Sequence, residues 1–165
     1  MTASLDFEKL IEIGDQFAEI SFEYKGPPSL GMMAWLDSME MKTWWKADNV
    51  IIEPYPGGMF YIAWSENDES NQTAIYGVME TLDADKNHIE ISKIFYMSSM
   101  GKMGPFYLQI RFEDAGKGFT RLWLRQTHKH EGQLQKLYKA AVFAAWPKSC
   151  SLLIKYLENE DSIRK

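Results

Sequence analysis

The sequence predicts an α+β fold, in which a run of antiparallel strands packs against one long C-terminal helix. Between residues 17 and 129, most segments alternate between apolar and polar positions as β-strands do, and one helical insertion interrupts them. Between residues 134 and 158, apolar residues instead recur at intervals of three and four, which is the period of an amphipathic helix. We expect residues 17–160 to form a single domain, with residues 1–16 as an N-terminal extension, and we expect the function to lie between helix and sheet.

Composition and charge narrow the class of protein. An apolar share of 45% in 165 residues can supply one core without disulfides, and the aromatic share of 14% is typical of a generously filled core or of an apolar cavity. A net charge of -5 with dispersed lysine and arginine argues against nucleic acid as a partner. No apolar run has the length of a membrane span, and the N-terminus lacks the pattern of a secretion signal. We therefore expect a soluble, cytoplasmic protein without membrane insertion, and the single cysteine is consistent with a reducing compartment.

The first predicted strand is Phe17–Tyr24, where apolar residues at even positions alternate with polar ones. A proline-rich segment ends this strand, and proline is favourable at the start of a helix. Residues 30–45 then have helical spacing, and Asp37–Ser38 divides them into two short helices. Because Trp44 and Trp45 are adjacent, a helix buries only one of them on a given face, and we expect the other at the mouth of a cavity or at an interface.

The segments that follow have the alternation of strands joined by short turns. These strands are expected at Val50–Glu53, Met59–Trp64, Thr73–Leu82, His88–Met97, Phe106–Phe112 and Phe119–His128. The first turn contains Gly57 and Gly58, which can adopt the positive φ angles of a tight reversal. Residues 83–87 have the polar composition of a hairpin turn. Residues 98–105 contain two glycines and two methionines, and we expect them to form a mobile loop at the rim of a cavity.

The final helix carries a narrow apolar stripe, formed by Trp146, Cys150, Leu153 and Leu157. Residues 134–145 keep the same spacing, but their stripe is shifted by about one residue, and the shift falls beside Pro147. Proline removes one backbone hydrogen bond of a helix and clashes with the preceding turn. We therefore expect a bend or a break near residues 145–147, which together with the 98–105 loop would gate entry to a cavity.

The order of these elements resembles the helix-grip fold of the START-like, or SRPBCC, superfamily, in which a curved antiparallel sheet of about six to seven strands wraps a long C-terminal helix. Three motifs are similar to the family named for the activator of heat-shock protein 90 ATPase. They are the tryptophan-bearing helix pair Trp35–Trp45, the glycine-glycine hairpin Glu53–Phe60, and the last strand and closing helix, represented by Gly118–Leu122 and Trp146–Leu157. This chain departs from the family pattern at Ala145, where glycine is usual, and at Pro147.

The resemblance covers residues from about 17 to 158 and implies a hydrophobic cavity beneath the C-terminal helix. It implies the activity less directly, because members of the superfamily include lipid carriers, cyclases and chaperone regulators.

The sequence contains no recognisable catalytic motif. His128 and His130 lie two residues apart beside Glu131, but no third ligand follows at a spacing typical of zinc sites. Cys150 lies on the buried stripe, and it would need a lowered pKa to act as a nucleophile. We therefore predict no catalytic residue, no metal site and no cofactor.

Polar residues on otherwise apolar strand faces indicate where a ligand would be held, because a buried polar group needs a partner. Glu80, Gln126 and His128 occupy such positions, although residues of this kind can also lie near strand ends or pair with one another. Large aromatic side chains from several strands would line the remainder. The predicted cavity residues are Trp44, Phe60, Trp64, Tyr76, Glu80, Phe95, Phe112, Gln126, His128, Trp146 and Cys150.

We therefore expect the protein to bind a small, largely apolar ligand between the sheet and the C-terminal helix, with Glu80, Gln126 and His128 fixing its orientation. A first alternative is a protein interaction module that resembles the chaperone ATPase activator and binds a chaperone or another protein, which requires an exposed patch rather than a cavity. A second alternative is a cyclase-like or hydrolytic enzyme that uses the same cavity. The sequence is also compatible with a homodimer.

Overall fold

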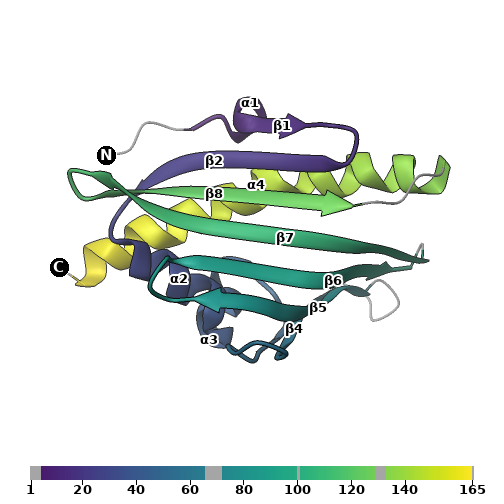
Figure 1. Cartoon of the computed structure of the whole chain (residues 1–165), viewed down its shortest axis with the longest axis horizontal. Coiled ribbons are helices and arrows are strands. Elements are labelled where there is room, and N and C mark those ends of the chain that lie inside the picture. Colours follow the sequence, from purple (N-terminus) through teal and green to yellow (C-terminus); the bar gives the residue numbers. More distant parts are fainter. Residues whose placement is uncertain (1–4, 66–71, 100, 129–132, 165) are drawn as a thin grey trace.

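The computed structural model of the chain has one curved antiparallel sheet with helices against one of its faces (Figure 1). It describes residues 5–65, 72–99, 101–128 and 133–164, and in the last range the side chains of residues 143–159. The strands are β1 (Ile11–Ile13), β2 (Phe17–Lys25), β3 (Asn49–Ile52), β4 (Met59–Ser65), β5 (Gln72–Asp83), β6 (His88–Ser98), β7 (Gly101–Gly116) and β8 (Phe119–His128). The helices are α1 (Phe7–Leu10), α2 (Pro28–Leu36), α3 (Ser38–Trp44) and α4 (Gln133–Arg164).

The eight strands have the order β1-β2-β8-β7-β6-β5-β4-β3, and each neighbouring pair is antiparallel. Figure 1 shows α2, α3 and α4 on the same side of this sheet. The predicted α+β class and the helix-grip arrangement are therefore confirmed. The sheet has eight strands, one more than the upper limit of the six to seven expected from the sequence.

The additional strand comes from residues before Phe17. β1 pairs with β2 and places Ile11 opposite Ile20. The short helix α1 brings Phe7 edge-on against Phe22, with ring centroids 5.1 Å apart, and Phe7 is buried. The segment that we expected to be an extension therefore packs onto the sheet, because its own apolar side chains cover part of the core.

The helical insertion consists of two helices, as predicted, because Asp37 ends the first and caps the second. Its Oδ1 accepts hydrogen bonds from the backbone N–H groups of Met39 and Glu40, at 2.9 and 3.0 Å. This is the arrangement of an N-cap. The first helix lies so close to the sheet that a Cβ at Gly31 would stand 2.4 Å from the Phe112 ring. Glycine at this position allows α2 to pack directly on β7.

The predicted loop at residues 98–105 is wrong, because most of these residues extend β6 and β7. Ser98 of β6 pairs with Gly101 of β7, and Met103 is buried as part of β7. Gly104 takes a φ of 141° within the strand, where a Cβ would stand 2.4 Å from the Ile94 carbonyl oxygen. The glycines of this segment therefore serve an irregular strand pairing rather than a flexible gate.

α4 continues through Pro147 without interruption, so the predicted break is wrong. The proline withdraws the donor that the Phe143 carbonyl would normally have, but apolar side chains on both sides of it remain packed on the sheet. The predicted stripe of Trp146, Cys150, Leu153 and Leu157 is buried, whereas the side chains of residues 134–141 lie outside the described set. Figure 1 shows α4 changing direction along its length.

Within the described ranges, no helix is both long and apolar enough to cross a membrane.

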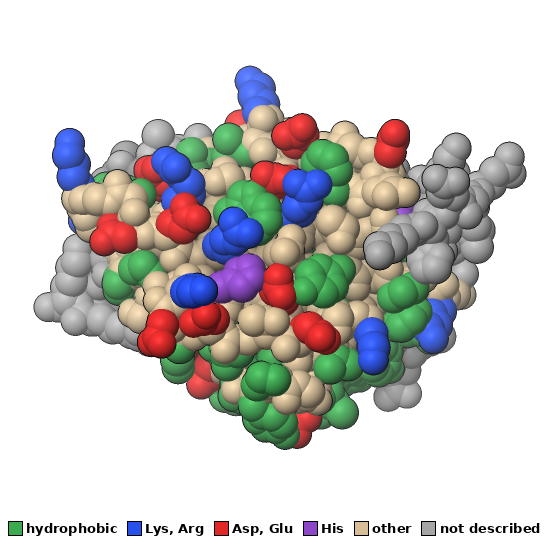
Figure 2. All heavy atoms as spheres, viewed as in Figure 1, with side chains coloured by type: hydrophobic (Ala, Val, Ile, Leu, Met, Phe, Trp, Pro, Cys, Tyr) green, Lys and Arg blue, Asp and Glu red, His purple; other side chains and the backbone are tan. Residues whose placement is uncertain are grey.

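The face of the sheet that points away from the helices carries a polar network centred on Glu90. Figure 2 shows acidic, basic and histidine side chains interspersed on this outer face. Glu90 Oε1 accepts a hydrogen bond from Gln109 Nε2 at 3.0 Å and lies 3.2 Å from His88 Nε2, and Tyr107 and Thr81 also donate to this carboxylate. Burial would raise the pKa of Glu90, but these hydrogen bonds outweigh it and lower the pKa to about 2.

We predict that Glu90→Gln lowers the free energy of unfolding at pH 7 by about 1 to 3 kcal/mol, because the carboxylate is held by more donors than an amide can satisfy. The folded-state pKa lies below the unfolded value near 4.5, so this contribution is present above that pH and is lost as the pH falls toward 2. Urea unfolding at pH 7 and at pH 3 measures the difference. The same change at the exposed Glu113 on β7 serves as the control, and an effect of Glu90→Gln that does not shrink with falling pH would contradict the account.

Candidate functional site

A group of buried aromatic rings, which we call the indole cluster, occupies the space where α2, α3 and α4 meet the sheet. It consists of Trp35, Trp44, Trp45, Phe60 and Trp146. The centroid of the Trp35 ring lies between 5.4 and 6.5 Å from those of the other four rings. Because interiors are close-packed, rings at these distances leave little room for a ligand among themselves.

Both members of the Trp44–Trp45 pair are buried, with 3% and 7% of their surface exposed, so the prediction that only one packs inward is wrong. The reason is that α3 ends at Trp44, and Trp45 takes the C-cap position, from which its ring stacks on that of Trp44 at 4.8 Å. The indole N–H groups are satisfied by neighbours. Trp44 Nε1 donates to the Ala34 carbonyl at 2.8 Å, and Trp45 Nε1 donates to Ser149 Oγ at 3.0 Å.

Two predicted polar residues, Gln126 and His128, are buried on the inner face of β8. Gln126 Oε1 accepts a hydrogen bond from Trp146 Nε1 at 2.7 Å, which ties β8 to α4. The His128 ring lies between Phe106 and Phe143, with centroids 5.8 and 6.0 Å away. These contacts make both residues part of the packing between sheet and helix.

A pocket of about 360 Å³ lies beside the indole cluster, where β4, β5 and β6 face α4 and the end of α3. Its lining residues are Trp45, Lys46, Trp64, Thr73, Ile75, Tyr96, Ala145, Lys148, Ser149 and Leu152. Hydrogen bonds hold three of these elements together, namely β4, the end of α3 and α4. Trp64 Nε1 on β4 donates to the Trp45 carbonyl at 2.9 Å, and the Trp45–Ser149 bond joins this unit to α4.

The pocket combines apolar walls with a few polar groups. The rings of Trp45 and Trp64 stand nearly perpendicular, at 80° with centroids 5.2 Å apart, and so form a corner. Ile75 and Leu152 complete the apolar lining. Burial raises the pKa of the Tyr96 phenol above its ordinary value, so this hydroxyl remains protonated and can donate a hydrogen bond. An arrangement of this kind can bind a small molecule by burying its apolar surface and orienting its polar end.

Among the predicted cavity residues, Trp64 is the one that lines this pocket. Trp44, Phe60 and Trp146 belong to the indole cluster. Phe112, Gln126, His128 and Cys150 are buried in the same core but are not among the lining residues. The structure therefore brings these side chains together as packing that supports the pocket.

The remaining candidates, Tyr76, Glu80 and Phe95, lie on the outer face of the sheet, away from the pocket. Tyr76 is 46% exposed, Glu80 Oε2 accepts a hydrogen bond from Ser92 Oγ at 2.7 Å, and Lys102 Nζ lies 4.1 Å from the centroid of the Phe95 ring. Shifts in the register between β5 and β6 account for this placement. A bulge exchanges the two faces of a strand, so simple alternation assigns the wrong face beyond it.

Several pocket residues were not identified by the sequence pattern. Ala145, Ser149 and Leu152 are spaced by four and three, so they form a second stripe along α4 beside the predicted one. That spacing is a signal from which they could have been found. Tyr96 could not, because alternation places Phe95 on the inner face and Tyr96 on the outer face, and the irregular pairing of β6 reverses the two.

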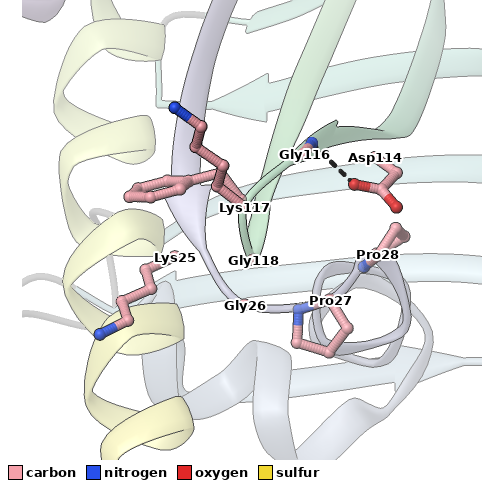
Figure 3. A pocket seen from close by; sticks show the side chains of 9 residues that line it. Lys25, Gly26, Pro27, Pro28, Asp114, Gly116, Lys117 and Gly118 are labelled. Carbon is pink, nitrogen blue, oxygen red and sulfur yellow. Dashed lines mark hydrogen bonds between the residues drawn. The ribbon is translucent and has the colours of Figure 1, made fainter.

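A larger depression of about 580 Å³ lies where the corner between β2 and α2 meets the β7–β8 turn (Figure 3). Its lining residues are Lys25, Gly26, Pro27, Pro28, Asp114, Gly116, Lys117, Gly118 and Phe119. Figure 3 shows the amino groups of Lys25 and Lys117 extending away from Asp114, whose Oδ1 accepts a hydrogen bond from the Gly116 N–H at 2.8 Å. The charged groups do not converge on one point, so we take the pocket beside α4 as the candidate site.

Comparison with known proteins identifies the family of the chain. Residues 32–158 match the family model described as activator of Hsp90 ATPase homolog 1-like protein. The chain belongs to this family. The match spans the tryptophan-bearing helices, strands β3 to β8 and most of α4, and so includes the elements that form the pocket. A comparison with curated protein sequences finds no match.

Solved structures of bacterial proteins have the same fold as this chain. A protein from Rhodobacter sphaeroides is 14% identical with a TM-score of 0.73, and the match covers 94% of this chain and 99% of that one. A protein from Nitrosomonas europaea is 19% identical with a TM-score of 0.70, covering 91% of this chain and 99% of that one. A protein from Arthrobacter aurescens is 15% identical with a TM-score of 0.72, covering 90% and 91%. At these identities the similarity establishes the fold alone.

Among the described residues, no three His, Cys, Asp or Glu side chains are grouped so as to hold a metal ion. His130 and Glu131 lie outside the described ranges. Burial raises the pKa of the Cys150 thiol far above its ordinary value. Cys150 therefore remains a protonated thiol in the core between α4 and the sheet.

We predict that Cys150 of the folded protein resists alkylation by iodoacetamide at pH 8, because the thiolate is the reactive form and burial suppresses it. The protein unfolded in concentrated urea should react readily through the same thiol. Mass spectrometry of the intact chain counts the added groups in both states. Equal rates of alkylation in the folded and unfolded states would contradict the burial of this residue.

Proposed function

We propose that this protein binds a small, largely apolar ligand in the pocket between β4–β6 and α4. The observation that carries the proposal is the pocket itself, a space of about 360 Å³ with the two perpendicular indoles of Trp45 and Trp64 as its walls. The membership of the family and the helix-grip fold support a site at this position. Apolar walls with a few polar groups are the usual composition of small-molecule sites.

The size of the pocket limits the ligand. Sites for small molecules typically span roughly 300 to 1,000 Å³, so this pocket is near the lower end of that range. The indole cluster fills the adjoining interior, and a long lipid chain would have to displace it. We therefore propose a compact ligand of one or two rings, or a short alkyl chain.

Binding would be driven by the removal of apolar surface from water. Burying 200 Å² of apolar ligand surface contributes about 5 kcal/mol at about 25 cal/mol per Å², before the cost of immobilising the ligand is subtracted. The hydroxyl groups of Thr73, Tyr96 and Ser149 would then fix the orientation of a polar end, which is the role that we assigned to other residues from the sequence.

We predict that Ala145→Phe lowers the affinity for the neutral fluorescent probe N-phenyl-1-naphthylamine by about tenfold or more, because the new ring would enter the pocket. Ala145 is exposed and lines the pocket, so the larger side chain can be accommodated without disrupting the core. Ala144→Phe is the matched control, since Ala144 is also exposed on α4 but does not line the pocket. Fluorescence titration measures both variants, and equal affinities in the two would refute this location of the site.

A protein interaction module is a second candidate, favoured by an exposed apolar patch near the edge strand β3. Ile51 and Met59 are each 48% exposed, and Tyr76 is 46% exposed. The register places Ile51 opposite Tyr61, and Tyr61 opposite Tyr76, so the patch runs across three strands. Figure 2 shows hydrophobic side chains gathered along the lower margin of this face. Patches of this kind often mark contacts between proteins.

This second candidate predicts that the protein stimulates the ATPase activity of heat-shock protein 90 and that Ile51→Lys removes the stimulation, because a charge in the patch would have to be desolvated on docking. Ile13→Lys is the matched control, since Ile13 is exposed on the edge strand at the other side of the sheet. A coupled ATPase assay measures the rates. Absence of stimulation by the unmodified protein would exclude this candidate.

A further inference from the structure

We propose that the pocket beside α4 selects ligands that carry a negative charge, namely compact apolar or aromatic carboxylates, and that Lys46 and Lys148 hold the charged end. This inference rests on the proposed function and adds the chemical class of the ligand. It depends on three observations, which concern the charge of the lining, the position of the two lysines and the nature of the remaining polar groups.

The charge of the pocket differs in sign from that of the chain. The protein has 23 acidic and 18 basic residues and a net charge of -5. The charged residues that line the pocket, however, are both lysines, Lys46 and Lys148. Both are exposed, and neither forms an ion pair within the part of the chain that the structure describes. A carboxylate at the mouth of the pocket would therefore meet two positive charges that no other described side chain neutralises.

The fold brings the two lysines to the same place from distant parts of the sequence. The hydrogen bond between Trp45 Nε1 and Ser149 Oγ joins the end of α3 to the middle of α4. Lys46 directly follows the first of these residues, and Lys148 directly precedes the second, so both flank this bond. The apolar corner made by Trp45 and Trp64 lies against the same bond. Both lysines also line the pocket. We therefore place the polar end of a ligand, whose rings would occupy this corner, beside these two side chains.

The uncharged polar groups of the lining can serve an acceptor on the ligand. The phenol of Tyr96 and the hydroxyls of Thr73 and Ser149 can each donate a hydrogen bond, and a carboxylate is purely an acceptor. The opposite possibility follows from the two indoles, because perpendicular aromatic faces can also hold a cation. The two lysines would repel a cation at the mouth of the pocket. The sign of the preferred ligand therefore distinguishes these two possibilities.

The experiment compares three probes with one ring system and one chain length, naphthylacetate, naphthylethanol and naphthylethylamine, by isothermal titration calorimetry. We expect naphthylacetate to bind about tenfold more tightly than naphthylethanol at low salt, and naphthylethylamine to bind most weakly. The ratio of the affinities for naphthylacetate and naphthylethanol should decrease as salt is added, because the lysine charges are exposed to solvent.

Variants assign the effect to the two lysines. We expect Lys46→Gln and Lys148→Gln to weaken naphthylacetate binding by about threefold each, and the double variant by about tenfold, with the affinity for naphthylethanol almost unchanged. Lys155→Gln is the matched control, because Lys155 is exposed on the same helix but does not line the pocket. A loss in the control equal to that in the double variant would overturn the assignment.

The outcomes separate this inference from the proposed function. Equal binding of naphthylacetate and naphthylethanol would overturn the selection of anions and leave the apolar pocket in place as a binding site. Tightest binding of naphthylethylamine would likewise overturn it in favour of a cation site between the indoles. Absence of binding by all three probes would overturn the proposed function itself.

Discussion

The packing of the Trp35 ring against four neighbouring aromatic rings is the constraint on which the structure depends. It connects α2 with α3, with β4 through Phe60 and with α4 through Trp146. Because these rings occupy the interior, the helix and the sheet are held apart at a fixed distance. The room that remains lies to one side, where Trp45 forms the boundary between the filled core and the pocket.

This division of the interior limits the size of the ligand that we propose. An open helix-grip cavity could take an extended lipid, whereas a pocket bounded by Trp45 and Trp64 has room for a compact molecule. The two sides of the sheet also differ in chemistry. The inner face contributes apolar walls, and the outer face carries the hydrogen-bonded network around Glu90, which stabilises the sheet without taking part in the pocket.

The sequence was sufficient to predict the fold, because the period of the hydrophobic residues and the order of the elements can be read from local stretches of the chain. The stripe through Trp146 and the division of the helical insertion at Asp37 were both found in this way. The position of the site was harder to predict, since it depends on irregular backbone. Lys93 takes a φ of 51° where the pairing of β6 with its neighbours is irregular, and this reverses the faces of Phe95 and Tyr96. The contacts of the N-terminal residues and the continuity of α4 likewise depend on tertiary packing, which overrides local signals.

The most direct test of this account uses the six indole N–H signals of the protein in a nitrogen-edited NMR spectrum, recorded during titration with N-phenyl-1-naphthylamine. The account predicts the largest shifts at Trp45 and Trp64, which line the pocket, and none at Trp123, whose indole N–H donates to Glu19 on the outer face. Shifts centred on Trp35 with Trp64 unchanged would contradict it, because they would place the ligand inside the packed cluster instead of beside it.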